Sequence, residues 1–175
     1  MPLLSFTEKD FLTVSDALEI AEDITANFFK FSTAQWKRHS YEVKTLGHLD
    51  PEEPAKEVLA FLKKGSAAGD EVKRKLKDYY LICLQDHMIL RAAQRDGKIA
   101  LLPLLLYVFT HELIHIVRFC SFMQRFDAHP AEREREERLV HELTYRALGD
   151  VPLPSLGYVL DSYSGHRAVE LGIPD

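Results

Sequence analysis

The chain has 175 residues, of which 46% are hydrophobic and 28% are charged, so it has the composition of an ordinary globular domain with one sizeable core. Its formal net charge of −5 argues against a general nucleic-acid binder, which usually presents a basic face. The two cysteines, Cys83 and Cys120, lie in apolar stretches and are expected to be reduced core residues, not a disulfide framework. We therefore treat residues 1–175 as a single domain.

The sequence carries no sign of secretion or of a membrane partner. Residues 1–4 are too short for the apolar part of a signal peptide, and no basic start precedes them. The longest apolar run, Ile99 to Phe109, is too short to span a bilayer. We expect a cytoplasmic protein, and nothing in the sequence indicates its oligomeric state.

Helical spacing dominates the N-terminal part of the chain. Ser15 is a suitable cap for a helix over residues 15–31, and a shorter helix is expected at 34–45. One face of the first helix is apolar at helical spacing, through Ala17, Ile20, Ala21, Ile24 and Phe28.

Two further helices are expected before residue 96. The sequence Asp50-Pro51-Glu52-Glu53 is typical of a helix start, and that helix is expected to end near Gly65. Asp70 is then a candidate cap for a helix that reaches Asp96. Its apolar stripe consists of Val72, Leu76, Tyr79, Tyr80, Cys83, His87 and Leu90.

The most apolar predicted helix runs from Pro103 to about residue 126. It is apolar almost all round, so we expect it to be central and buried. Residues 127–130 break it, and the next helix covers 131–148 before Gly149. The tail after residue 150 is rich in Pro, Gly and Ser and is expected to form loop and short turns.

These elements predict an all-α fold. Only residues 98–102 have the character of a strand, and one strand makes no sheet. The expected architecture is an irregular bundle of five to six helices around the central helix, with a loop-rich C-terminal tail.

The central helix contains the sequence His111-Glu112-Leu113-Ile114-His115, which reads H-E-x-x-H. Residues four apart lie on the same face of a helix, one turn above each other. Two imidazoles placed in this way can hold one metal ion, and Glu112 can reach a metal-bound water. The alternative is a pair of core histidines, hydrogen-bonded to backbone or carboxylate.

A catalytic zinc site needs a third protein ligand. The short connection after the central helix predicts that the next helix packs against it antiparallel, with residues near 141 level with His115. Glu137 and His141 share a face there, and Glu136 is a rival. Against Glu137 stands the alternating charge of residues 132–138, which is typical of a solvated helix face.

Other polar residues have weaker claims on the site. His87 and Asp86 beside it are both expected to be ordinary core residues. The alternatives are a ligand or supporting role for His87, and Asp86 as a carboxylate that accepts the second ring N–H of a ligating histidine. No donor to a developing oxyanion is assigned by spacing. The available residues are Tyr107, Arg118, Tyr145 and His166.

His111, Glu112 and His115 resemble the motif of the zincin metallopeptidases. A glutamate some twenty residues further on, from the next helix, resembles the gluzincin branch, and Glu137 stands 22 positions after His115. The metzincin branch is not matched, because Arg118 stands where it has glycine. The resemblance covers about residues 103–148.

This resemblance implies one zinc per chain, bound by His111, His115 and Glu137, with Glu112 as general base. It also implies a peptide or protein substrate. Zincin peptidases typically place a β-sheet before the motif helix, and its edge strand aligns the peptide. The pattern of this chain predicts no such sheet.

The leading hypothesis is therefore a zinc-dependent hydrolase of the zincin type, acting as a small intracellular metallopeptidase. The first alternative is a non-catalytic metal-binding helical protein, a degenerate zincin with a regulatory or interaction role. The second is a di-metal carboxylate bundle, because Glu112-x-x-His115 fits the Glu-x-x-His element of that class. Against this second alternative, Glu137 and His141 are spaced by four, not three.

Overall fold

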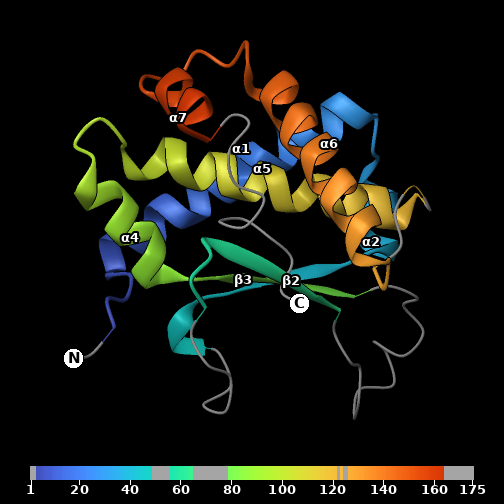
Figure 1. The fold of residues 1–175 in the computed structure, drawn as a ribbon, viewed down its shortest axis with the longest axis horizontal. Coiled ribbons are helices and arrows are strands. Elements are labelled where there is room, and N and C mark those ends of the chain that lie inside the picture. Colours follow the sequence, from blue (N-terminus) through green and yellow to red (C-terminus); the bar gives the residue numbers. More distant parts are fainter. Residues whose placement is uncertain (1–2, 49–55, 65–78, 122, 124–125, 164–175) are drawn as a thin grey trace.

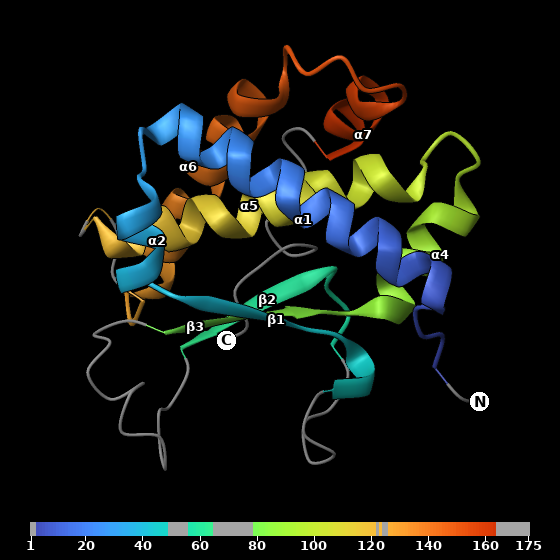
Figure 2. The same cartoon turned by 180° about the vertical axis from the view of Figure 1, so that it is seen from behind.

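The structure is a computed structural model, which describes residues 3–48, 56–64, 79–121, 123 and 126–163. In this part of the chain, a layer of helices lies on one side of a three-stranded sheet (Figure 1). The view from behind shows the same two layers, with helices α1 (Glu8–Phe29) and α5 (Leu101–Cys120) side by side (Figure 2). The buried apolar residues of α1, α5 and the sheet form one core cluster.

Helix α1 begins two turns before the expected cap. Thr7 and Asp10 form a capping box, in which the Thr7 hydroxyl accepts from the Asp10 N–H and the Asp10 carboxylate accepts from the Thr7 N–H. Ser15 is therefore an exposed residue within the helix and not its cap, which corrects that prediction. The face turned to α5 is made of small residues that allow close approach, namely Val14, Ala17, Ala21 and Thr25.

The sheet is the main departure from the all-α prediction. Strand β1 (Tyr41–Lys44) pairs parallel with β3 (Tyr80–Leu84), and β2 (Ala60–Lys64) pairs antiparallel with β3. The order β1-β3-β2 puts β3 in the centre and β2 at an edge of the described sheet. The fold is mostly helical, as expected, but it is not purely α.

Each strand lies where the sequence predicts helix. Helix α2 (Thr33–Arg38) ends early, and β1 takes the rest of the helix expected at 34–45. Strand β3 is a short apolar run, almost wholly buried, and periodicity cannot distinguish such a run from a piece of buried helix. Helix α4 (Asp86–Arg95) begins only after it. The helix start at 50–53 lies outside the described residues, and so does Asp70.

Helix α5 is the central buried helix that the sequence predicts, although it ends at Cys120. It is long and apolar enough to cross a membrane, but 83% of its most apolar window is buried inside the molecule, which accounts for its composition. Residues 98–102, which have the character of a strand in the sequence, do not form one, because α5 begins at Leu101. Cys83 and Cys120 are both buried, as expected of core residues.

Two helices follow α5. Helix α6 (Pro130–Leu148) confirms the helix expected at 131–148, and in both views it lies against the C-terminal half of α5 (Figures 1 and 2). Helix α7 (Leu156–Tyr163) contacts α5 and occupies part of the tail expected to be loop. The site described next is built where α6 meets α5.

Candidate metal centre

His111 and His115 are fully buried on α5, and their ring centroids lie 4.9 Å apart. The helical spacing therefore places both imidazoles on one face, as the motif predicts. This face is turned towards α6, because both rings contact the same α6 carboxylate.

That carboxylate belongs to Glu137, which is itself buried. Its Oε1 lies 2.8 Å from Nε2 of His111, and its Oε2 lies 2.9 Å from Nε2 of His115. Since an ionised carboxylate only accepts hydrogen bonds, both imidazoles present Nε2–H to it in the metal-free protein. The solvated-face interpretation of Glu137 is therefore wrong.

The rival residue Glu136 is turned away from the histidines. Its carboxylate pairs with the guanidinium of Arg118, which donates from Nη2 to Oε2 at 3.2 Å and also from Nε to Oε1. This ion pair engages both oxygens of Glu136, so the structure distinguishes the two neighbouring glutamates.

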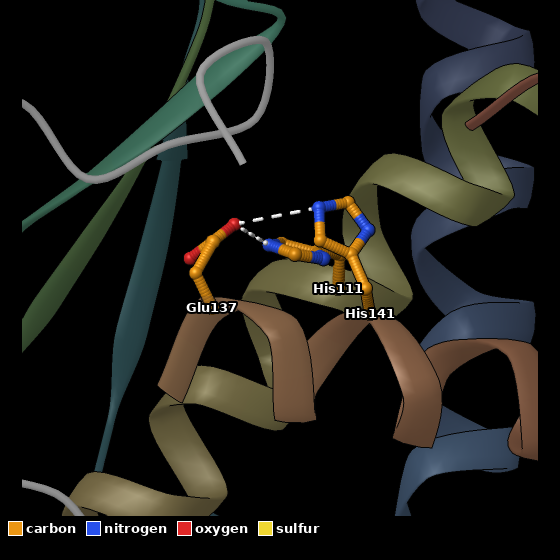
Figure 3. A group of neighbouring side chains, drawn as sticks. All are labelled: His111, Glu137 and His141. Carbon is orange, nitrogen blue, oxygen red and sulfur yellow. Dashed lines mark hydrogen bonds and ion pairs between the residues drawn. The ribbon is translucent and has the colours of Figure 1, made fainter. Parts of the chain in front are cut away.

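His141 lies beside the same cluster, one helical turn after Glu137. Its Nε2 is 3.7 Å from Oε1 of Glu137, and its ring centroid is 4.7 Å from that of His111. Figure 3 shows the three side chains converging, His111 from α5 and the other two from α6. One ligand atom from each of the three residues lies within 4.8 Å of the others, so this buried His/Glu/His cluster can bind a metal ion.

The electrostatics of the cluster suit a cation. Burial lowers the pKa of His111, and burial followed by repulsion from His111 lowers the pKa of His141 to about 4, so both are neutral at pH 7. Burial alone would raise the pKa of Glu137, but attraction and hydrogen bonds from His111 and His115 outweigh it and hold the carboxyl ionised. Neutral imidazoles and an ionised carboxylate are the forms that ligate metals.

Glu112 is buried next to the first histidine. Burial, with a smaller contribution from Glu137, raises the pKa of its carboxyl to about 8, although His115 opposes the shift. Its Oε1 has no hydrogen-bond partner among the described residues, and the same holds for Nε2 of His141. Buried polar atoms are rarely left in this state, so these two atoms fit a site that takes a bound cation and an oxygen ligand.

Other predicted residues lie elsewhere. Asp86 is buried and accepts from the backbone N–H of Phe6 at 3.0 Å and from that of Leu46 at 2.9 Å, as expected of a core residue, so both of its carboxylate oxygens are engaged away from the histidines. His87 is buried on α4, as expected of a core residue. His166 lies outside the described residues.

Tyr107 is the residue whose role the sequence left unassigned. It lies one turn before His111 on α5, and its hydroxyl is 2.6 Å from Nδ1 of His141. The spacing 107, 111, 115 is a single helical face, and this signal was available in the sequence.

Comparisons with protein-family models, with curated proteins and with solved structures find no match. The resemblance to the zincin peptidases therefore depends on the residues of α5 and α6 and on their geometry.

Proposed function

We propose that this protein is a metal-dependent hydrolase in which His111, His115 and Glu137 hold one zinc ion. The observation that carries the proposal is the single buried carboxylate of Glu137, whose two oxygens lie 2.8 and 2.9 Å from the two Nε2 atoms of the motif. This brings together the two-histidine, one-carboxylate donor set of a catalytic zinc site. When bound, zinc polarises a carbonyl group and lowers the pKa of water.

Glu112 is the proposed general base. It lies next to a proposed ligand, and its carboxyl pKa of about 8 in the metal-free protein is close to the working pH, where a group can both accept and return a proton efficiently. A cation bound beside it favours the ionised, proton-accepting form. In this role Glu112 takes a proton from the attacking water and passes it to the leaving group.

A peptide or protein substrate is the one that the zincin resemblance implies. Strands β1, β3 and β2 precede the motif helix in the chain, and β2, at an edge of the described sheet, contacts α5. Ala60, Phe61 and Leu62 of β2 are at most 2% exposed, so we do not place the peptide on this strand, and the proposed substrate class depends on the metal site and on the resemblance.

A non-catalytic metal site is the second candidate, and His141 is the observation that favours it. If His141 bound the metal as a fourth ligand, the coordination sphere would be closed, as in structural sites. The di-metal interpretation has less support, because only Glu112 and Glu137 bring carboxylates to the cluster among the described residues.

The test combines metal content with hydrolysis. Purified protein is expected to contain about one zinc per chain and to cleave peptides from a mixed fluorogenic library. A chelator is expected to remove the activity, and zinc to restore it. Glu136→Gln is the matched control, because Glu136 neighbours Glu137 but pairs with Arg118. Stoichiometric zinc without any cleavage would favour the non-catalytic protein, and two metal ions per chain would favour the di-metal bundle.

A further inference from the structure

The hydroxyl of Tyr107 and the imidazole of His141 form a partly buried pair beside the proposed metal site. Tyr107 is 2% exposed, and its Oη lies 2.6 Å from Nδ1 of His141. Among the described residues, this is the one hydrogen bond of the Tyr107 hydroxyl. Burial raises the pKa of the phenol well above its ordinary value, so the hydroxyl keeps its proton.

The charge of Glu137 decides the direction of this contact. If Nδ1 of His141 donated its proton to Tyr107, the phenol proton would have no acceptor among the described residues, and a bare Nε2 would face Oε1 of Glu137 at 3.7 Å. With Tyr107 as the donor, the phenol proton has an acceptor and the Nε2–H of His141 faces the carboxylate, so Tyr107 donates to Nδ1. A neutral imidazole that accepts at Nδ1 carries its proton on Nε2.

His111 differs from His141 in this respect. Nδ1 of His111 has no hydrogen-bond partner among the described residues, so no described donor blocks a proton there. This ring can therefore offer Nε2 to a metal, at the cost of one unpartnered Nδ1–H. If His141 moved its proton to Nδ1, the hydroxyl proton of Tyr107 would lose its acceptor. His141, whose Nδ1 is occupied, is also the histidine farthest from the carboxylate. Its Nε2 lies 3.7 Å from Oε1 of Glu137, whereas the Nε2 atoms of the motif histidines lie 2.8 and 2.9 Å from the oxygens of Glu137.

We propose that Tyr107 locks His141 in the Nε2–H tautomer, so that His141 stays outside the coordination sphere of the metal and presents an N–H donor beside its open position. This inference rests on the proposed metal site. An N–H nitrogen has no lone pair for a metal, but it can donate to a substrate oxygen that develops negative charge. Tyr107 is thus a positioning residue that keeps a three-ligand site open.

Helix α7 supports the position of the Tyr107 ring. Tyr163 stacks on Tyr107 with ring centroids 5.4 Å apart and an interplanar angle of 23°. The ring of Tyr107 lies close to parallel with that of His141 as well, at 28°. Tyr163 therefore covers one face of the Tyr107 ring, and His141 lies at its hydroxyl edge, nearly in the plane of the phenol.

The first test reads the tautomer directly. Nitrogen-15 NMR of the histidine rings separates protonated from bare ring nitrogens, and the His141→Gln variant identifies which signals belong to His141. In the zinc-loaded wild type, His141 is expected to show protonated Nε2 and bare Nδ1. A zinc-bound Nε2 on His141 would overturn the proposal.

The second test uses cobalt(II), whose visible absorption reports coordination, with azide as a probe of an open position. Azide is expected to change the spectrum of the wild type. Tyr107→Phe removes the donor to Nδ1 of His141, so Nδ1 can carry the ring proton and Nε2 can bind the metal. His141 is then expected to become a fourth ligand, with the cobalt affinity raised and the azide response lost. Tyr163→Phe keeps the stacked ring and serves as the matched control.

His141→Gln tests the proposal independently, in case Tyr107→Phe fails to fold. It is expected to keep wild-type cobalt affinity and the azide response, whereas a large loss of affinity would show that His141 is a ligand and would overturn the proposal. A Tyr107→Phe variant with a wild-type spectrum would also overturn it. Failure of the wild type to bind cobalt would refute the proposed metal site itself, and the two failures are therefore distinguishable.

Discussion

Replacing Glu137 by Gln tests the metal centre most sharply, because Gln preserves size and removes the charge. In the metal-free protein the carboxylate accepts from both motif histidines, and an amide oxygen can replace one of these two bonds. Losing one hydrogen bond to a charged group costs about 1.5–3 kcal/mol, or about 3–12 °C in Tm for a chain of this size.

The rise in Tm on adding zinc shows whether Glu137 is a metal ligand or only a structural residue. A ligand at 1,000 times its Kd stabilises the native state by about 4.1 kcal/mol, which corresponds to a rise in Tm of about 8–16 °C here. Wild type is expected to show this rise and Glu137→Gln to lose most of it, because an amide is a poor substitute for an anionic zinc ligand.

The assay is thermal unfolding followed by circular dichroism, with and without excess zinc. The matched control is Glu136→Gln, which loses part of the ion pair with Arg118 but is expected to keep the full zinc-dependent rise. A Glu137→Gln protein that keeps the whole rise would refute the assignment of Glu137 as a ligand, whatever its stability without metal.

Four further outcomes are expected. Glu112→Gln should keep zinc and abolish hydrolysis, since the amide cannot accept the proton; unchanged turnover would rule out the base. His111→Ala and His115→Ala should each lose zinc, and full occupancy in both would place the site elsewhere. The folded pKa of Glu112, about 8, is raised above the unfolded value of 4.5, so its contribution to the stability of the metal-free protein is present below pH 4.5 and is lost as pH rises towards 8. The unfolding free energy should therefore fall over this range more steeply in wild type than in Glu112→Gln, and parallel curves would contradict the shift. Asp86→Ala should destabilise the fold by about 2–5 kcal/mol, because the buried backbone N–H of Phe6 and the partly buried one of Leu46 lose their acceptor. It should leave zinc affinity unchanged, and weakened zinc binding would restore a role for Asp86 at the site.

The sequence predicted the helices that carry the site because their signals are local. Residues 111 and 115 share a helical face wherever the helix lies, and the Gly149 stop and the 127–130 break delimit α6 without knowledge of its neighbours. The distinction between Glu136 and Glu137 was not local. It depends on Arg118, whose guanidinium engages Glu136 from α5 and leaves Glu137 to the histidines.

The sheet could not be predicted from local pattern for a related reason. Strand β3 pairs with partners on both sides, β1 about forty residues earlier in the chain and β2 about twenty, so its conformation is decided by hydrogen bonds that no short window contains. Gln85, between β3 and α4, illustrates this dependence on distant partners. Its backbone N–H donates to the carbonyl of Leu59 at 2.9 Å. An apolar run without these partners would have been equally compatible with helix.

The choice between an enzyme and a closed metal site depends on whether His141 binds the metal. With His111, His115 and Glu137 alone, one coordination position stays available and Glu112 has a water to deprotonate. With His141 as a fourth ligand, no metal-bound water is left for Glu112 to deprotonate. The burial that raises the pKa of its carboxyl to about 8 would then only reduce the stability of the fold. The buried Glu112 has no hydrogen-bond partner at Oε1 among the described residues, and His141 has its Nδ1 engaged by Tyr107. The open site explains both observations, and the closed site explains neither.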